Sequence, residues 1–305
     1  MNRESTLLHV LERRLITCQL PLGGWGFGRL SSQPALEPTC LSLLALRARP
    51  GSVPERGLRF LLQAQNPNGS WPAFGGDDRD GCWATALAVT VLVNCAQVTP
   101  PIDRGLGWLL RSKGRESHWL WKWKFRTADT RVRFNPDKFG WPWIPGTCSW
   151  VVPTAFSLLA LKQSFVCCPT REVNFRIERG VGMLLDRACP GGGWNAGNGV
   201  VYDVPLAPHL DATAAALLAL RGEQPNGIIA KSLDWLEQRT GTCSAPWSLA
   251  WSILALNAHG RSEKTALATL AAISASDAID DCATLAAVLL ALGCQIQGNV
   301  FRVTS

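Results

Sequence analysis

Acidic and aromatic side chains gather at the expected amino-terminal ends of six apolar segments. The set holds carboxylates, indoles, two thiols and an imidazole: Glu37, Asp80, Cys82, Trp83, Trp143, Cys148, Trp150, His209, Asp211, Trp247, Asp280 and Asp281. A carboxyl group can donate a proton, and an indole face stabilises a nearby cation through its quadrupole. If the six segments converge, these residues would line one end of a shared cavity, where helix dipoles also favour anions.

Helix capping is a simpler interpretation of the same acids. Asp211 and Glu37 each stand two residues before a threonine, Thr213 and Thr39, at the start of an apolar segment. An acidic side chain at that place can accept hydrogen bonds from the unpaired amides of the first turn. The shared register favours capping, and Asp80 has the same alternative.

A repeated pattern connects these segments. The stretch RGLRFLLQAQNPNGSW, residues 56–71, begins with helical spacing of apolar residues and ends in a Pro-Asn-Gly stop followed by a tryptophan. The pattern returns at 179–194 and in part at 19–25, 104–109 and 231–236. Such self-similarity indicates a fold built from repeated units.

A second kind of segment follows each repeat and is rich in leucine and small residues. Four of these segments carry a threonine seven residues before a closing leucine, at Thr39, Thr85, Thr154 and Thr213. Because they are apolar nearly all round, we expect them to be buried on every face, whereas the charged sides of the repeats must face outward. Six outer and six inner helices alternate, which predicts an all-α fold, an α6/α6 toroid that occupies residues 1–305 as one domain.

An insertion at about 114–147 interrupts this regularity. Within it, WLWKWKFR at 119–126 alternates aromatic and cationic residues, and RVRF at 131–134 alternates likewise. Alternation has the period of a strand, so the insertion is predicted to be a β-hairpin. Its aromatic face would pack on the toroid, or residues 119–134 would contact a membrane surface with tryptophan at the interface and cations near lipid phosphates.

Composition sets limits on the class of protein. The 305 residues are 47% hydrophobic and 17% charged, with a net charge of +7. That charge allows contact with an anionic surface, but the basic residues are scattered, which argues against a nucleic-acid partner. The first twenty residues do not resemble a secretory signal, and no apolar run is long enough to span a bilayer. We therefore expect a cytoplasmic protein, with its 11 cysteines reduced and membrane contact at most peripheral.

The repeat resembles the "QW" element of squalene–hopene and oxidosqualene cyclases. At 56–71 the fixed positions of that element are an Arg-Gly pair, an aromatic–aliphatic pair, Gln, Gly and Trp. Two residues separate the first pair from the second, three separate the second pair from Gln, three separate Gln from Gly, and one separates Gly from Trp. GWPW at 140–143 and SWVVPT at 149–154 also resemble that superfamily, which includes protein prenyltransferase β subunits. The resemblance covers about residues 5–295 and implies a single-toroid member, with function to be argued from the site.

For a cyclase, the resemblance implies an acid-catalysed reaction of a polyprenyl or triterpenoid-like lipid, by an isomerase or lyase. The family's Asp-x-Asp-Asp-Thr-Ala motif aligns with HLDATA at 209–214, so its catalytic acid corresponds to Asp211, with His209 and Ala212 in place of the flanking acids. Loss of those partners weakens the acid. The candidates for substrate binding are Trp83, Trp143, Trp150, Trp247, Trp251, Glu37, Asp80 and Asp281.

Other functions stay open. The sequence DGCW at 80–83 resembles the prenyltransferase motif that supplies two zinc ligands, which makes Asp80 and Cys82 weak metal candidates, but no histidine follows at the family's position. The acidic loop 77–80 would be a site for Mg²⁺. We expect no cofactor. A non-catalytic toroid that binds a lipid or a protein partner is the remaining alternative.

Overall fold

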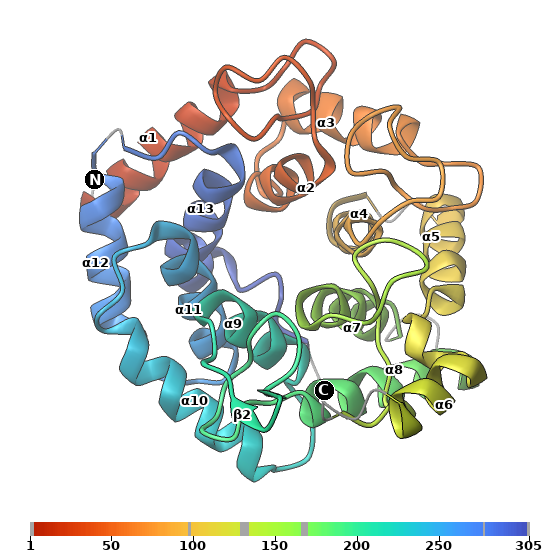
Figure 1. The fold of residues 1–305 in the computed structure, drawn as a ribbon. Coiled ribbons are helices and arrows are strands. Elements are labelled where there is room, and N and C mark those ends of the chain that lie inside the picture. Colours follow the sequence, from red (N-terminus) through yellow and green to blue (C-terminus); the bar gives the residue numbers. More distant parts are fainter. Residues whose placement is uncertain (1–2, 97–98, 129–133, 166–169, 277, 304–305) are drawn as a thin grey trace.

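Six inner helices form a closed ring in the computed structural model, which describes residues 3–96, 99–128, 134–165, 170–276 and 278–303 (Figure 1). They are α2 (Leu36–Ala45), α4 (Ala84–Val91), α7 (Val151–Phe165), α9 (Leu210–Ala219), α11 (Pro246–Ala258) and α13 (Cys282–Gln297). Each contacts the next, and α13 contacts α2 to close the ring. Their side chains are buried on nearly every face, as the uniformly apolar sequences predict.

Six outer helices surround this ring. They are α1 (Arg3–Thr17), α3 (Ser52–Gln63), α5 (Thr99–Arg111), α8 (Arg171–Asp186), α10 (Gly227–Thr240) and α12 (Lys264–Ser274). Each buries one apolar stripe and exposes the opposite face. The first helix, α1, packs against α12 and α13, so the amino-terminal and carboxy-terminal units lie side by side (Figure 1). The predicted α6/α6 toroid is confirmed.

A tryptophan–threonine clasp joins the outer part of a repeat to the inner helix that follows. The backbone amide of Trp71 donates to the Thr85 hydroxyl over 2.9 Å, and the Trp71 indole Nε1 donates to the Leu61 carbonyl over 2.8 Å. The same two kinds of hydrogen bond recur at three other tryptophan–threonine pairs: Trp25 with Thr39, Trp141 with Thr154, and Trp194 with Thr213. The repeated threonine is thus a bridge between layers.

The Arg-Gly pair of the repeat receives the clasp of the preceding unit. A Cβ atom on Gly105 would lie 2.9 Å from the Trp71 indole and 2.6 Å from Val89, so only glycine fits beneath that ring. Gln65 donates to the Pro101 carbonyl at 2.9 Å and accepts from Arg104 Nε at 3.2 Å, which ties its own unit to the next outer helix. These contacts explain why Arg, Gly, Gln and Trp recur together.

The insertion differs from the prediction, because Trp119–Thr127 is an α-helix, α6, and not a strand. His118 caps its amino terminus by accepting from the Leu120 amide at 3.4 Å. Trp121 stacks on Phe125 four residues later, with ring centroids 6.0 Å apart, and the Lys124 ammonium lies 4.7 Å from the Trp121 ring. Contacts between side chains three and four residues apart therefore favour a helix here, although the alternating pattern is typical of a strand. The predicted second strand at 131–134 falls almost wholly outside the described residues, since only Phe134 is described.

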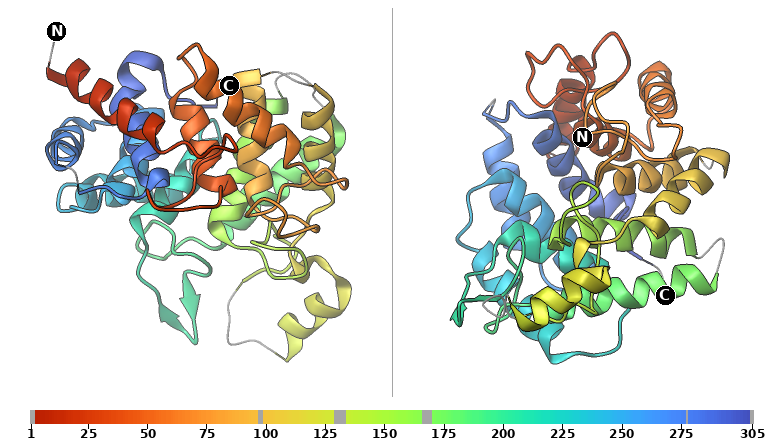
Figure 2. Two further views of the ribbon diagram at one scale, coloured as in Figure 1. Left: turned by 90° about the horizontal axis from the view of Figure 1, so that it is seen from above. Right: turned by 45° about the vertical axis from the view of Figure 1, so that its right-hand side comes forward.

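A short hairpin is found elsewhere, between the fourth outer and inner helices. Strands β1 (Val200–Val201) and β2 (Val204–Pro205) pair antiparallel around Tyr202 and Asp203, which have φ values of 52° and 62°. The hairpin and α6 project from the same side of the toroid (Figure 2, left). In the described part of the chain, no helix is long and apolar enough to cross a membrane.

Candidate functional site

A cavity of about 270 Å³ lies inside the ring, at the amino-terminal ends of the inner helices. Most of its surface is apolar, and two carboxyl groups, an imidazole and four indoles reach it. Its lining consists of Glu37, Leu41, Trp83, Leu87, Trp143, Val152, Phe156, Ala196, His209, Asp211, Ala212, Ala215, Trp247 and Trp251. Its size is close to the lower end of the range of about 300–1,000 Å³ that is typical of small-molecule sites.

Ten of the residues in the helical wall of the cavity form two stacked rings of side chains, each with one residue from, or directly before, five of the inner helices. The mouth ring contains Glu37, Trp83, Val152, Asp211 and Trp247. Every member of the second ring follows a member of the mouth ring by four residues: Leu41, Leu87, Phe156, Ala215 and Trp251. Residues i and i+4 share a helix face and are separated by about 6 Å along the axis. The chemistry at the mouth is therefore polar and aromatic, and the interior is apolar.

Aromatic rings form a continuous chain of contacts around part of this wall. Trp143 meets Trp83 edge to face with centroids 5.2 Å apart, and Trp83 lies 5.5 Å from Phe156. Phe156 meets Trp251 at 5.3 Å, and Trp251 meets Trp247 at 5.6 Å. Edge-to-face packing fixes each ring against its neighbour. The exposed π faces form a surface that is suited to an apolar ligand or to a cation.

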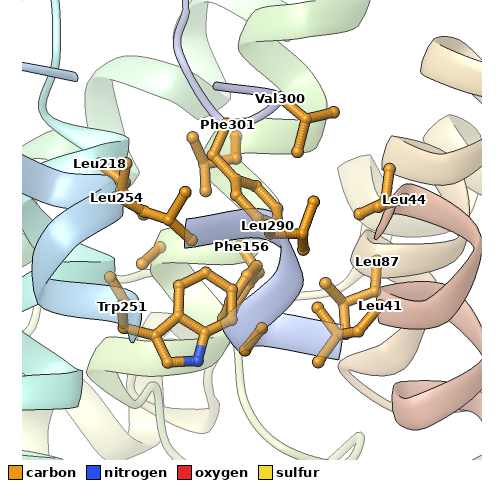
Figure 3. Close-up of a cluster of buried hydrophobic side chains, with 14 of the residues drawn as sticks. Leu41, Leu44, Leu87, Phe156, Leu218, Trp251, Leu254, Leu290, Val300 and Phe301 are labelled. Atoms are coloured by element: carbon orange, nitrogen blue, oxygen red, sulfur yellow. The ribbon is translucent and has the colours of Figure 1, made fainter. Parts of the chain in front are cut away.

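The carboxy-terminal segment closes the far end of the cavity. Phe301 is fully buried, with its ring 5.1 Å from Trp251 and 6.2 Å from Phe156 (Figure 3). The segment is held by the Val300 carbonyl, which accepts from Gln163 at 2.8 Å, and by Asn299, which donates to the Leu254 carbonyl at 2.7 Å. Phe301 thus packs behind two members of the second ring.

Glu37 has the environment of a proton donor. It lies in the first turn of α2, where the N-cap residue is Ala35 and not Glu37. Burial raises the pKa of the Glu37 carboxyl to about 7, and the negative charge of Asp281 adds to this effect. A carboxyl with that pKa keeps its proton at a pH at which an ordinary glutamate has lost it.

Asp211 and His209 stand across the ring from Glu37, because α9 is three helices away from α2 in either direction. Asp211 is in the first turn of α9, and that helix has no side-chain cap. His209 is exposed at the mouth, and its backbone amide donates to the Trp194 carbonyl at 2.8 Å. Two carboxyl groups in different settings therefore face one cavity.

Other predicted site residues lie outside the cavity. Asp281 caps α13 by accepting from the Thr284 amide at 2.7 Å, so capping is the correct interpretation there. Asp80 is exposed, and Trp150 is partly exposed beside Gly197. Neither lines the cavity. The negative charge of Asp281 nevertheless contributes to the raised pKa of Glu37.

The zinc hypothesis does not fit the side chains at 80–82. A zinc site needs several convergent ligands, and DGCW supplies at most two of them. Cys82 is buried and Asp80 is exposed, so the two do not meet at a common cavity. Among the described residues there is no group of three or more His, Cys, Asp and Glu side chains that could hold a metal ion. The acidic loop 77–80, the candidate Mg²⁺ site, provides no such group either.

The second ring and the closing phenylalanine were missed by sequence reasoning, apart from Trp251. Each residue of the second ring follows a mouth-ring residue such as Glu37, Trp83 or Asp211 by four positions, and residues at that spacing share a helix face. This spacing could have identified the second ring from the sequence. Phe301 carries no repeat signal, since it follows the last inner helix.

Comparison with known proteins gives a clear result for the fold and a limited one for the sequence. No family model matches the chain. It is 29% identical over 113 residues to an uncharacterized protein of Bradyrhizobium diazoefficiens, a match that covers 34% of this chain and 19% of the relative. The chain therefore spans about a fifth of the length of the curated relatives it matches.

Solved structures share the toroid. The type II terpene cyclase MstE from Scytonema, in complex with the product merosterolic acid A, superposes with a TM-score of 0.57 at 15% identity, over 88% of this chain and 78% of the cyclase. An alpha-amylase from Clostridium perfringens superposes with a TM-score of 0.64 at 10% identity, over 96% and 99% of the two chains. At such identities the likeness is one of fold, and the chain has the α/α toroid that terpene cyclases and other enzymes share.

Proposed function

We propose that the protein binds a polyprenyl or terpenoid-like lipid in its central cavity and isomerises or cyclises it by acid catalysis. The observation that carries this proposal is Glu37, a carboxyl with a pKa of about 7 that faces a cavity walled by indoles. A proton donor, an apolar interior and cation-stabilising rings are the parts that alkene protonation requires. The structural neighbour MstE, which has been solved with geranylgeranyl dihydroxybenzoate as substrate, supports the choice of ligand class.

The chemistry follows from the positions of the acids. Glu37 would give its proton to one carbon of a double bond, whose π electrons form the new C–H bond, leaving a carboxylate and a tertiary cation. A second double bond of the same chain would then attack that cation and close a ring. Trp83, Trp247 and Trp251 would stabilise the moving positive charge. Loss of a proton to Asp211 or His209 would end the reaction without a cofactor.

Glu37 replaces Asp211 as the preferred donor in this proposal. The resemblance to the cyclase motif points to Asp211, but the flanking positions are His209 and Ala212. Glu37 keeps its proton near neutral pH because burial raises its pKa to about 7, and it holds the equivalent register two residues before the clasp threonine Thr39. We therefore assign proton donation to Glu37 and leave Asp211 as the opposing carboxyl group.

Peripheral membrane contact through α6 completes the proposal. Trp119 and Trp123 are 69% and 63% exposed, and Lys124 and Arg126 lie in the last turn of the same helix. Interfacial tryptophan with nearby cations suits an anionic lipid surface. Sedimentation with phosphatidylserine vesicles should decrease for the Trp119→Ala/Trp123→Ala double variant, and equal sedimentation of both proteins would contradict the contact.

A lipid-binding toroid without turnover is the second candidate function. It is favoured by the departures from the cyclase motif at His209 and Ala212. Such a protein would bind the same ligands in the same cavity, and Glu37 would then only shape that cavity. Binding and turnover must therefore be measured separately.

Glu37→Gln is the variant that separates the two candidates. The protein would be incubated with farnesol, geranylgeraniol and squalene, and products of unchanged mass with fewer double bonds would be sought by gas chromatography and mass spectrometry. We expect at least about 100-fold loss of turnover with ligand binding retained, since the amide cannot donate the proton. Asp80→Asn, an exposed acid outside the cavity, is the matched control and should be unaffected. Binding to the wild type without any product would favour the second candidate.

A further inference from the structure

The first and last units of the toroid meet where the end of α1 lies beside the start of α13 (Figure 1). Arg14, in the last turn of α1, donates to the Ile279 carbonyl at 2.9 Å and to the Ser276 carbonyl at 3.3 Å. The loop after α1 continues this contact, because the Cys282 amide donates to the Phe27 carbonyl at 2.6 Å. Hydrogen bonds thus hold together two segments from opposite ends of the sequence, and we call this junction the seam.

A cysteine lies on each side of the seam. Cys18 directly follows α1 and comes four residues after Arg14, so both side chains are on the side of α1 that meets the start of α13. Cys282 is the first residue of α13. The Cys282 thiol donates a hydrogen bond to the Cys18 sulfur, and both cysteines are free thiols. The backbone contacts of the seam therefore bring two sulfur atoms together.

The two thiols differ in their access to solvent. Cys18 is partly exposed, whereas Cys282 is only 1% exposed. A small reagent that comes from solvent therefore meets the Cys18 sulfur first. The Cys282 sulfur lies behind it, in the place of a group that can react with Cys18 after that first step.

The surroundings of the pair favour a thiolate at Cys18. The hydrogen bond from Cys282 lowers the pKa of the Cys18 thiol, and the positive charges of Arg29 and Arg14 act in the same direction, against the effect of burial. Arg29 is held at the seam because its Nη2 donates to the Ile279 carbonyl at 3.3 Å. The contact between the sulfurs also raises the pKa of Cys282. The seam thus pairs an accessible nucleophile with a buried, protonated thiol.

We propose that Cys18 and Cys282 are a redox-active pair, in which hydrogen peroxide oxidises Cys18 and Cys282 then forms a disulfide with it across the seam. The bond would join the first outer helix to the last inner helix. This modification site does not depend on the proposed lipid chemistry, because neither sulfur lines the cavity.

The two steps balance without a further reagent. The Cys18 thiolate attacks one oxygen of the peroxide, so an S–O bond forms, the O–O bond breaks and hydroxide leaves. The Cys282 sulfur then attacks the sulfur of the Cys18 sulfenic acid, an S–S bond forms, and the oxygen leaves as water with the Cys282 proton. The hydroxide takes up the proton that the Cys18 thiol had released. The thiols lose two electrons and two protons, and the peroxide becomes two molecules of water.

Alkylation rates test the reactivity of Cys18. The reduced protein would be treated with iodoacetamide at slightly acidic pH, and the labelled peptides would be quantified over time. Cys18 should react at least about tenfold faster than Cys148, which is also partly exposed but whose pKa is raised by burial. Cys282→Ala removes the hydrogen-bond donor and should slow the reaction at Cys18. Equal rates at Cys18 and Cys148 in the wild type would overturn the proposal.

Oxidation of the wild type tests the pairing and needs no variant to fold. After treatment with hydrogen peroxide, alkylation of free thiols and digestion with trypsin, the peptide 15–29 should be joined to the peptide 265–302. The second peptide contains Cys294 as well as Cys282, so fragmentation must place the bond at Cys282. Absence of this bond, or a bond from Cys18 to Cys294, would overturn the proposal.

Variants test the order of the two steps. Cys282→Ala should stop at the sulfenic acid of Cys18, which dimedone would trap, and Cys18→Ala should leave Cys282 unoxidised. Cys243→Ala is the matched control, since Cys243 is also partly exposed, and this variant should form the bond as the wild type does. Rapid oxidation of Cys282 in the Cys18→Ala variant would contradict the assignment of Cys18 as the thiol that peroxide attacks.

Discussion

Tryptophans of the clasps and tryptophans of the cavity wall differ in what their polar atoms do. In the clasps, the indole N–H of Trp71 donates to the Leu61 carbonyl. The Thr85 hydroxyl accepts from the backbone amide of Trp71 and donates to the Trp71 carbonyl. In the cavity wall, Trp251 packs against the rings of Phe156, Trp247 and Phe301, and its N–H has no acceptor. One residue type thus holds the helical layers together in one region and lines a cavity in the other. Hydrogen-bond satisfaction distinguishes the two roles where burial alone does not.

Replacement of a clasp tryptophan and of a cavity tryptophan by alanine should give the largest difference in the free energy of unfolding between the two regions. Trp71 is fully buried and fills the space between two outer helices and an inner one, so Trp71→Ala should lower the free energy of unfolding by about 3–5 kcal/mol. Trp247 is partly buried at the mouth, so Trp247→Ala should lower the free energy of unfolding by less than about 1 kcal/mol. The same variant should bind farnesol more weakly than the wild type. Chemical denaturation and calorimetry on both variants provide the measurement. Equal losses of stability would remove the distinction between clasp and wall.

Removal of one clasp hydroxyl should have a smaller effect. Thr85→Val leaves the buried amide of Trp71 without its acceptor, so we expect a loss of about 1–3 kcal/mol in the free energy of unfolding. Thr90→Val on the same helix is the matched control, because the Thr90 hydroxyl only donates to the Ala86 carbonyl within α4. Its loss should cost about 0.5–1.5 kcal/mol. Denaturation midpoints compare the two, and a control as costly as Thr85→Val would contradict the bridging role.

The pH dependence of stability should show the smallest effect and should come from the cavity. Because the pKa of Glu37 is raised to about 7 in the folded protein, the unfolded chain releases this proton at lower pH than the folded chain does. The carboxyl therefore costs stability progressively between about pH 4.5 and 7, by about 1–2 kcal/mol after allowance for solvent access. Glu37→Gln should remove that decline, so the variant gains stability relative to the wild type at pH 8 and not at pH 4. Parallel melting-temperature profiles would contradict the raised pKa.

Much of the toroid could be predicted from the sequence, because its periodicity is local. The Arg-Gly and Trp spacing reflects a ring packed on glycine, and the threonine register reflects the clasp, so both recur with each unit. The hairpin prediction for 119–126 failed because alternation of aromatic and cationic residues also suits a helix with Trp121 over Phe125. A one-dimensional pattern could not decide between them.

The cavity was predicted only in part, because its properties depend on contacts between distant segments. Trp83, Trp143 and Trp247 were expected there from their places at helix ends, and the structure brings them together. The raised pKa of Glu37 depends on burial and on Asp281, which is far away in the sequence. Phe301 closes the pocket through contacts with Phe156 and Trp251 that no local signal announces.

Photolabelling with a diazirine analogue of farnesol would test most directly whether the indole-walled cavity is the lipid site. The labelled peptides would be mapped by mass spectrometry, with excess farnesol as competitor. We expect saturable labelling of peptides that contain Trp83, Phe156 and Trp251. Labelling confined to a second apolar groove, which lies between α1, α12 and α13 and is lined by Leu267 and Ile296, would contradict the assignment of the lipid site to the cavity.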